Sequence, residues 1–451
     1  TSGWSGGGGR APGQAATTSG AAAGSAAGSP VSSGAVRGVT ATTVAIGVLY
    51  ADDGKKAIGA AGGSADRGRE DEEYKILFSA INAAGGIEGR RIVPVWYETA
   101  FGDSRPQSEI EQPACERFTS DQPVFAVLTT KAGGATDSFK RCLERAGVVH
   151  IAGNFTIAGA KTYEEFPHYA EPNGLGIERA AAAYTPSMNE RKWFTGWNAT
   201  TGESAPGASK VGVVTFDYPT FQKAVDDVLV PALRKVTTVG PIVRLNPYDS
   251  GQMNSAISSA VLQFRQAGVT HVAFLQSTGA PPLLFIQQAN SQGYYPRYGF
   301  TSQDVMPLLH EAGLVPVAGK VFNGAKGVGW WPSADVSYGR NEYASRPAAK
   351  ACLATLAKGG KAPSSGLQQT LSFFHCDVVN LLRASLDAAN AITPTAFRAG
   401  LDRLGGTFAA AGTLQSRPSS ARRDGVTAVR GFAWSGSCSC FVHDGPERPV
   451  P

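Results

Sequence analysis

The chain has 451 residues, of which 42% are hydrophobic and 17% are charged, and its formal net charge at pH 7 is +5. This length predicts two lobes or domains rather than one small core, and no apolar run reaches the roughly 18 residues that a membrane-spanning helix needs. Because Lys and Arg are not clustered with aromatic residues, nucleic acid is not an expected partner.

Residues 1–38 consist of Gly, Ala, Ser and Thr with scattered Pro. A segment of this composition cannot offset its ordering entropy by burial, so we expect a flexible tether there and order from Val39 onward. The segment shows no basic start followed by an apolar stretch, and it therefore does not read as a signal peptide.

From residue 39 the sequence alternates between short apolar runs and helical patterns. A buried strand rich in β-branched residues is predicted at 43–50, and an amphipathic helix precedes the next strand. Gly85 and Gly86 end that helix, because glycine adopts the left-handed cap conformation without steric cost. The other elements expected in this half are strands at 92–97, 124–128 and 148–152 and helices at 66–84, at 104–119 and up to residue 146.

The same alternation starts again after about residue 172. Strand–helix alternation with short loops predicts a parallel sheet covered on both faces and connected by right-handed crossovers. The elements expected are strands at 210–216, 241–245, 272–275 and 297–300, helices at 172–188, 250–267 and 281–292 and one that ends at residue 235, a strand near 320–323, helices at 339–358, 366–390 and 393–404, and short strands at 426–434 and 438–442.

The fold class is therefore α/β, with two doubly wound lobes. The long helices and the final strands follow both lobes in sequence, so we expect each lobe to be built from two separate segments. The predicted first lobe comprises residues 39–172 and about 304–408, and the second comprises residues 173–303 and about 409–451.

Six cysteines are present, an even number that suits an oxidising compartment. Cys115 and Cys142 lie on predicted helices that flank one strand, which is compatible with a bridge, and Cys352 and Cys376 fall on two consecutive predicted helices. Six buried free thiols in a cytosolic protein are the alternative. The remaining two, Cys438 and Cys440, are given no predicted pairing.

Catalytic motifs give little support to an enzyme. No GxSxG turn follows a predicted strand, and neither a P-loop nor an HExxH sequence occurs. No CxxC sequence or His/Cys cluster predicts a zinc site, and we expect no cofactor. His150, His271 and His375 lie in or beside predicted core segments and are expected to be structural.

Residues 81–89, with the sequence INAAGGIEG between a helix and a strand, resemble a motif of the type I periplasmic binding proteins. The similarity is strongest to the branch that binds branched-chain amino acids for ATP-driven importers, and it extends over residues 40–445. Cys115 and Cys142 occupy positions where many members of that family carry a disulfide. Ser291-Gln292-Gly293-Tyr294 matches the family at the end of a helix in the second lobe.

This resemblance implies two α/β lobes joined by three crossing segments, with a cleft that closes on a small-molecule ligand. It also implies an extracytoplasmic protein, expected as a monomer, that hands its ligand to a membrane permease. The tether resembles the spacer behind the lipidated cysteine of bacterial surface lipoproteins, so a lipid anchor outside this sequence is expected. A ligand-sensing receptor module of the same fold is the alternative function, and an α/β enzyme is less favoured.

In the first lobe, the resemblance points to loops that follow strands, where ligands of open α/β sheets bind. The loop that begins at Thr129 matches the family's carboxylate-binding loop, although Thr as a helix cap is an equal alternative. The candidate ligand-binding residues of this lobe are Tyr50, Asp52, Thr130, Lys131, Ala132, Asn154 and Phe155.

In the second lobe, Tyr218 and Phe221 lie where the family places a stacking aromatic ring. Amino-acid binders commonly carry an acidic residue after the strand that ends at Leu275, but here the sequence reads Gln276-Ser277-Thr278. An amino-acid ligand is therefore disfavoured, with Asp304 as the nearest substitute. Trp330 is a candidate for the hinge side of the cleft, with packing between the lobes as the favoured alternative. The candidates of this lobe are Tyr218, Phe221, Gln276, Ser277, Asp304 and Trp330.

Overall fold

The computed structural model describes residues 36–60, 62–103, 105–131, 135–153, 155, 158–247, 250–315 and 320–450. The first described residue is Val36, three residues before the predicted start of order at Val39. The Arg37 side chain donates hydrogen bonds to the carbonyl oxygens of Thr119 (2.5 Å) and Ala146 (3.1 Å). Residues 36–38 therefore belong to the folded protein, while the rest of the tether expected over residues 1–38 lies outside the described residues.

The first lobe is built on a five-stranded parallel sheet in the order β2-β1-β3-β4-β5. Side chains of β1 alternate between two cores, because successive residues of a strand point to opposite faces. Val48 packs against α2 and the later helices, and Leu49 packs against α3 and α4. The strands are β1 (Thr43–Ala51), β2 (Arg91–Thr99), β3 (Ala126–Thr129), β4 (Val149–Ala152) and β5 (Tyr169–Ala170), and the helices between them are α1 (Lys55–Ala60), α2 (Glu70–Ala83), α3 (Gln107–Glu116) with a π-helical turn (Arg117–Asp121), α4 (Asp137–Arg145) and α5 (Ala160–Glu165).

The glycine-pair motif sets the return from α2 into β2. The Asn82 side-chain amide donates to the carbonyl of Ile92 (3.1 Å) and accepts from the Ile92 N–H (2.7 Å), which ties the helix end to the strand. Gly86 has φ 79°, and a Cβ there would lie 2.1 Å from the carbonyl oxygen of Arg90. Only glycine fits at that position, and the motif is structural.

The second lobe contains a seven-stranded sheet in the order β14-β13-β12-β11-β10-β8-β9. Strands β8 to β12 run parallel, whereas β13 and β14 are antiparallel additions at one edge. Its strands are β8 (Lys210–Phe216), β9 (Thr238–Leu245), β10 (His271–Leu275), β11 (Arg297–Thr301), β12 (Lys326–Gly329), β13 (Ala428–Ser435) and β14 (Cys440–Pro449), and β6 (Trp197–Asn198) and β7 (Glu203–Ser204) form a separate hairpin.

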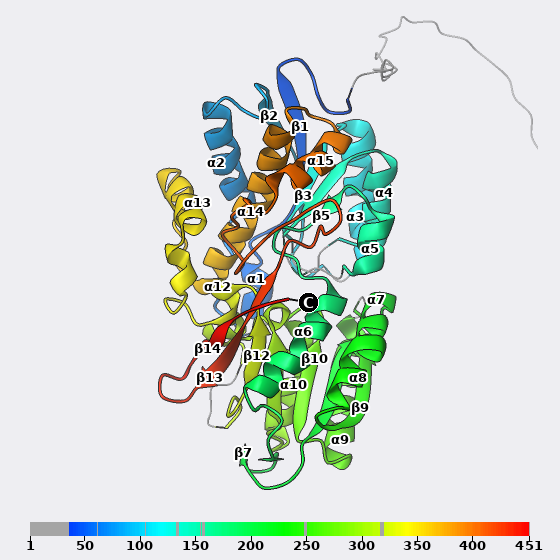
Figure 1. Cartoon of the computed structure of the whole chain (residues 1–451), viewed down its shortest axis with the longest axis vertical. Coiled ribbons are helices and arrows are strands. Elements are labelled where there is room, and N and C mark those ends of the chain that lie inside the picture. Colours follow the sequence, from blue (N-terminus) through cyan, green and yellow to red (C-terminus); the bar gives the residue numbers. More distant parts are fainter. Residues whose placement is uncertain are drawn as a thin grey trace, which may run out of the picture. The chain divides into compact units, whose positions relative to one another are not determined.

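Helices cover both faces of this second sheet, as Figure 1 shows. They are α6 (Ile177–Glu190), α7 (Pro219–Lys223), a π-helical segment (Ala224–Leu229), α8 (Val230–Leu233), α9 (Ser250–Gln266), α10 (Ala280–Ser291), a 3-10 turn (Ser302–Asp304), α11 (Met306–Glu311) and α12 (Pro332–Asp335). The predicted fold class, two α/β lobes with parallel sheets, is confirmed.

Three later helices return to the first lobe: α13 (Pro347–Lys358), α14 (Gly366–Ala389) and α15 (Pro394–Leu404), preceded by a 3-10 turn (Glu342–Ser345). Their apolar side chains pack into the same core as β1 and α2. The chain thus passes between the sheets after β5, after β12 and after α15.

Two sequence-based assignments differ from the structure. The strand expected near 320–323 is a turn, and the strand lies at Lys326–Gly329, where it pairs with β11 in the second sheet. This strand falls inside the range 304–408 that the sequence assigned to the first lobe, while the exact division into lobes stays a prediction. The helix expected from residue 339 begins at Pro347, because proline suits the first turn of a helix.

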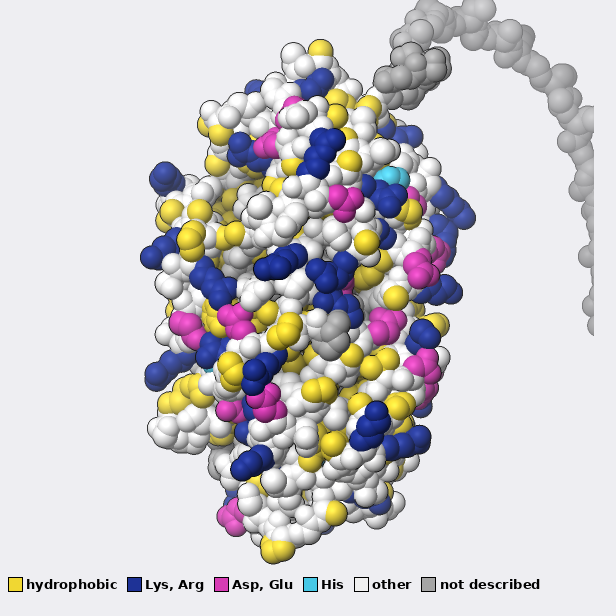
Figure 2. All heavy atoms as spheres, viewed as in Figure 1, with side chains coloured by type: hydrophobic (Ala, Val, Ile, Leu, Met, Phe, Trp, Pro, Cys, Tyr) yellow, Lys and Arg dark blue, Asp and Glu magenta, His cyan; other side chains and the backbone are white. Residues whose placement is uncertain are grey.

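The cysteines pair as Cys115–Cys142 and Cys352–Cys376, the two bridges compatible with the sequence. The third bridge joins Cys438 and Cys440, only two residues apart, at the turn between β13 and β14. On the face drawn in Figure 2, basic and acidic side chains are interspersed, in keeping with the small net charge.

Candidate functional site

A cavity of about 300 Å³ lies at the carboxyl ends of strands from both sheets. Its first-lobe wall comes from segments after β1, β2 and β4 and from the start of α14, and its second-lobe wall comes from segments after β10 and β11. This is where an open α/β sheet places its ligand. The lining residues are Ile58, Ala65, Arg67, Phe101, Phe155, Thr278, Gly279, Ala280, Leu283, Val305, Leu308, Leu309, Ala312, Leu314, Leu367 and Leu371.

Arg67 is the charged side chain among these lining residues. Its Nη2 donates to Oε1 of Glu70 at 2.7 Å, and its guanidinium lies 4.8 Å from the centre of the Phe101 ring. Only 5% of Arg67 is exposed, and its Nη1 is buried with no hydrogen-bond partner among the described residues. A buried N–H group without a partner is costly, and Nη1 of Arg67 is such a group in a residue that lines the cavity.

A buried polar network holds Arg67 from behind. Oε2 of Glu70 accepts a hydrogen bond from the Thr130 hydroxyl (3.1 Å), which also bonds the hydroxyl of Tyr74 (3.0 Å). His375 of α14 bonds Oε2 of Glu73 through Nδ1 (2.6 Å), and its Nε2 lies at an ion-pair distance of 3.7 Å from Glu70. Two cations and two carboxylates therefore compensate one another beside the cavity.

The pKa values of this network follow from its charges. Burial alone would lower the pKa of His375, but Glu70 and Glu73 outweigh it and raise that pKa to about 9. Burial acts to raise the pKa of Glu70, yet Arg67 and His375 hold it below its ordinary value. His375 is therefore protonated, and Glu70 ionised, near neutral pH.

Two of the predicted first-lobe residues support the site without lining this cavity. The Asp52 carboxylate accepts from the backbone N–H groups of Gly54 (3.2 Å) and Phe101 (2.9 Å), so it fixes the loop that carries Phe101. Thr130 belongs to the Glu70 network. Their direct contact with a ligand stays a prediction.

The other first-lobe candidates divide between the cavity and the core. Phe155 lines the cavity and packs edge-on against Trp331 (5.8 Å). Tyr50 is buried against Trp96 instead. Lys131 pairs with Glu111 (3.0 Å) away from this cavity lining. Two further candidates, Ala132 and Asn154, lie outside the described residues.

The second-lobe candidates are mostly buried behind the cavity wall. Phe221 is fully buried against Phe216 and serves the core. The Gln276 side chain donates to the carboxyl of Asp304, whose pKa burial raises to about 8 in spite of its hydrogen bonds. Ser277 is 1% exposed. These four side chains are absent from the cavity lining, to which the neighbouring segments contribute instead.

Tyr218 and Trp330 have other roles. The Tyr218 hydroxyl donates to the Asp137 carboxylate at the start of α4, which joins the second lobe to the first. Trp330 is 1% exposed and packs edge-on against Trp331, 5.7 Å away between ring centres, and its place at the hinge side of the cleft stays a prediction.

Sequence reasoning missed Arg67 and the leucines that follow β11. Arg67 stands three residues before Glu70, and Glu70 is the first residue of α2. That spacing of opposite charges was the available signal. Leu308 and Leu309 come soon after Asp304, beyond the end of a strand. Only the tertiary structure shows that they line the cavity.

The sequence matches a family described as periplasmic binding protein over residues 43–435. The chain belongs to the periplasmic binding protein family. The resemblance expected from residues 81–89 is thereby confirmed, and membership of this family implies an extracytoplasmic location. No curated protein matches the sequence. Among the described residues of this periplasmic binding protein, no helix is long and apolar enough to cross a bilayer, and no group of three or more His, Cys, Asp or Glu side chains is arranged to hold a metal ion.

Solved structures share the two-lobed fold at low sequence identity. A fatty acid ABC transporter substrate-binding protein from Thermomonospora curvata is 14% identical, with a TM-score of 0.59 over 91% of this chain and 93% of that one. A solute-binding protein from Rhodopseudomonas palustris HaA2, in complex with p-hydroxybenzoic acid, is 14% identical, with a TM-score of 0.61 over 90% and 97%. A substrate-binding protein from Desulfitobacterium hafniense, in complex with Leu, is 14% identical, with a TM-score of 0.57 over 89% and 100%.

Proposed function

We propose that this periplasmic binding protein is the substrate-binding component of an ABC importer and takes a small organic solute into the cavity between its lobes. The observation that carries this proposal is that loops of both sheets contribute to one cavity at their strand ends. A ligand in contact with both walls favours the closed arrangement of the lobes, and a permease can distinguish closed from open protein.

The lining further supports a mainly apolar ligand with one polar end. Aliphatic and phenyl side chains make up most of both walls, and the Nη1 donor of Arg67 is the one buried polar group without a partner among the lining residues. No carboxylate belongs to the described lining, so the ammonium group of an amino acid would lose its water without gaining a counter-charge. A medium-chain or aromatic carboxylate suits these walls better than leucine.

Among the proteins with this fold, one is a fatty acid ABC transporter substrate-binding protein and another is in complex with p-hydroxybenzoic acid, whereas a third is in complex with Leu. Because Glu70 already balances the charge of Arg67, the ligand must offer an acceptor oxygen but needs no full negative charge. Esters and amides with the same apolar part are therefore included in the proposal.

A thermal-shift series tests the proposal. Octanoate, methyl octanoate, 4-hydroxybenzoate, octylamine and leucine are compared at equal concentration, because a ligand that binds only the folded state raises its melting temperature. We expect octanoate to raise Tm by about 2 °C or more at saturation, and leucine and octylamine to leave it unchanged. Small-angle scattering should show compaction with octanoate. Unchanged Tm and scattering across a broad library of solutes would refute the solute-binding function.

The importer role needs a cellular measurement. Cells that lack this protein should lose uptake of the labelled ligand, and the wild-type gene should restore it. Normal uptake without the protein would instead favour the sensor function. Attachment through a lipid group and a monomeric state are further parts of the proposal, tested by detergent phase partitioning and by sedimentation of the cell-derived protein.

A further inference from the structure

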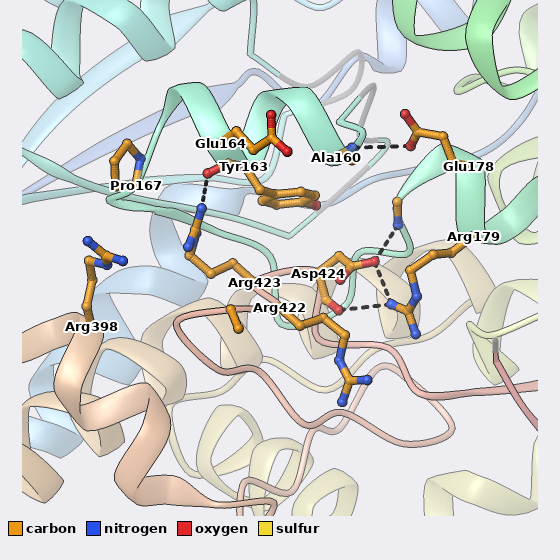
Figure 3. A pocket seen from close by; sticks show the side chains of 12 residues that line it. Ala160, Tyr163, Glu164, Pro167, Glu178, Arg179, Arg398, Arg422, Arg423 and Asp424 are labelled. Atoms are coloured by element: carbon orange, nitrogen blue, oxygen red, sulfur yellow. Dashed lines mark hydrogen bonds and ion pairs between the residues drawn. The ribbon is translucent and has the colours of Figure 1, made fainter.

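A second and larger cavity, of about 500 Å³, lies beside the first and third segments that connect the lobes. Figure 3 shows its side chains, which come from α5, from the start of α6, from α15 and from residues 421–424. It shares no lining residue with the cavity at the strand ends. The two cavities are therefore separate candidates for binding.

Four arginines line this second cavity, and one of them is neutralised in place. Arg179 pairs with Oδ2 of Asp424 at 2.6 Å, and the same carboxylate accepts from the backbone N–H of Gly176 at 2.9 Å. This pair occupies the start of α6. The three other arginines, at 398, 422 and 423, make no ion pair among the described residues.

Arg423 is buried beside the cavity without a carboxylate. Only 6% of it is exposed, and its guanidinium donates to the carbonyl oxygen of Tyr163 (Figure 3) and to that of Ser420. Its Nε is buried and has no hydrogen-bond partner among the described residues. Burial lowers the pKa of Arg423, and the positive charge of Arg398 lowers it further, whereas Tyr163 and Glu144 offset part of this decrease. The two guanidinium groups thus lie within each other's field.

Arg398 likewise makes no ion pair among the described residues, although it lies in the field of Glu144. Its Nε is buried and unpartnered among the described residues, and the nearby Glu144 is already engaged by His168 at 2.7 Å. Two further acids line the cavity at its other side. Glu178 accepts from the backbone N–H of Ala160 at 3.3 Å, and the carboxylate of the exposed Glu164 is directed away from Arg423 in Figure 3. Positive charge therefore remains at the end of the cavity formed by Arg398 and Arg423.

We propose that this cavity binds a phosphate group, either inorganic phosphate or a phosphate monoester. Guanidinium groups form forked hydrogen bonds with phosphate oxygens, and a doubly charged oxyanion would be attracted by Arg398 and Arg423, which line the cavity without an ion pair among the described residues. The volume of about 500 Å³ leaves room for an organic part beside the phosphate. Because α5 and α15 belong to the first lobe while α6 opens the second, a bound phosphate also links the segments through which the lobes move.

Isothermal titration calorimetry on the purified protein tests this assignment. Inorganic phosphate and phenyl phosphate are titrated at an ionic strength held constant with NaCl, into wild type and into Arg398→Gln and Arg423→Gln variants. Each variant should bind phosphate about tenfold more weakly or worse, since it loses a charged hydrogen-bond donor. Arg403→Gln is the matched control, because Arg403 is an exposed arginine near the end of the same helix α15. It should bind like wild type.

The outcomes separate clearly. No phosphate heat above that of chloride in the wild type, or equal weakening by Arg403→Gln and Arg398→Gln, overturns the proposal. Circular dichroism of each variant shows whether the fold is kept, and Arg398→Gln decides the matter if Arg423→Gln does not fold. Sedimentation with phosphatidylglycerol vesicles, but no binding of the free phosphates, would overturn the soluble-ligand assignment in favour of a lipid headgroup. Arg67→Lys should leave phosphate binding unchanged, so failure here is distinct from failure of the proposed solute binding.

Discussion

The two walls of the strand-end cavity differ in how they use polar groups. The first-lobe wall brings Arg67 to the cavity and balances it with a buried network of Glu70, Thr130 and His375. The second-lobe wall is mainly aliphatic, and Gln276 and Asp304 are buried behind it, where they bond to each other and accept from the backbone N–H groups of Thr278 and Thr301. Under the proposed function, the first lobe would orient the polar end of a ligand and the second lobe would close over its apolar part.

The largest effect on stability is expected from replacing Glu70 in the network behind the first-lobe wall. Glu70→Gln leaves Arg67 and His375 without their shared counter-charge, which should lower the free energy of unfolding by about 3 kcal/mol or more. Urea denaturation measures this loss. Asp71→Asn is the matched control on the same helix turn, because its partners Arg69 and Lys75 are partly exposed and such pairs contribute about 1 kcal/mol or less. Equal losses in both variants would contradict the importance of the buried network.

The second effect is a pH dependence of the protein's stability that arises from His375 in the same network. The pKa of His375 is raised from 6.5 to about 9 in the folded protein, so its stabilising contribution is fully present below pH 6.5 and is lost as the pH rises to 9. At about 1.4 kcal/mol per pH unit, the loss approaches 3 kcal/mol over this interval. Urea unfolding at pH 6, 7.5 and 9 should show the decline. His375→Asn should flatten it, and an unchanged slope in that variant would assign the decline to other groups.

The third change tests ligand orientation at Arg67. Arg67→Lys keeps the charge beside Glu70 but removes the Nη1 nitrogen. Octanoate should therefore bind about tenfold more weakly, while stability changes little. Calorimetric titration gives the affinity, and urea unfolding gives the stability. Unaltered octanoate affinity in this variant would show that the acid does not use Nη1.

The smallest change concerns the opposite wall. Leu283→Ala on α10 removes an aliphatic contact and should reduce the affinity gained per added methylene, which is about 0.8 kcal/mol for full burial. Affinities for hexanoate, octanoate and decanoate in both proteins measure that increment. Leu262→Ala, an exposed leucine on α9, is the control and should leave the increment intact. An equal increment in all three proteins would place the apolar chain elsewhere.

Sequence patterns predicted the scaffold well because they report local interactions. The strand at Lys210–Phe216 and the α2–β2 return depend on β-branched burial and on a glycine cap, which are properties of neighbouring residues. The predicted position of β12 was wrong by several residues, because Lys326–Gly329 is short and glycine-rich. This strand is defined by its pairing with β11.

The site was harder to predict for the opposite reason. Loops after strands were the right places to search, yet Arg67 sits in a stretch of small and charged residues that reads as surface. It is buried in contact with Phe101 and Glu70, which are distant or helical neighbours that the local composition does not reveal. Gln276 and Asp304 have the composition of ligand groups, but their mutual hydrogen bond turns them inward. No local pattern distinguishes these two cases.

Helix α14 contacts the strand-end cavity, the buried network around Glu70 and the third connecting segment. Its first turns place Leu367 and Leu371 at the cavity, His375 follows one turn later, and Asp377 accepts from the backbone N–H groups of Ala411 (2.6 Å) and Gly412 (2.8 Å) in the third connecting segment. The helix runs without interruption over 24 residues. A ligand that displaces the first turns of α14 would therefore also shift Asp377 and, through its hydrogen bonds, the third connecting segment.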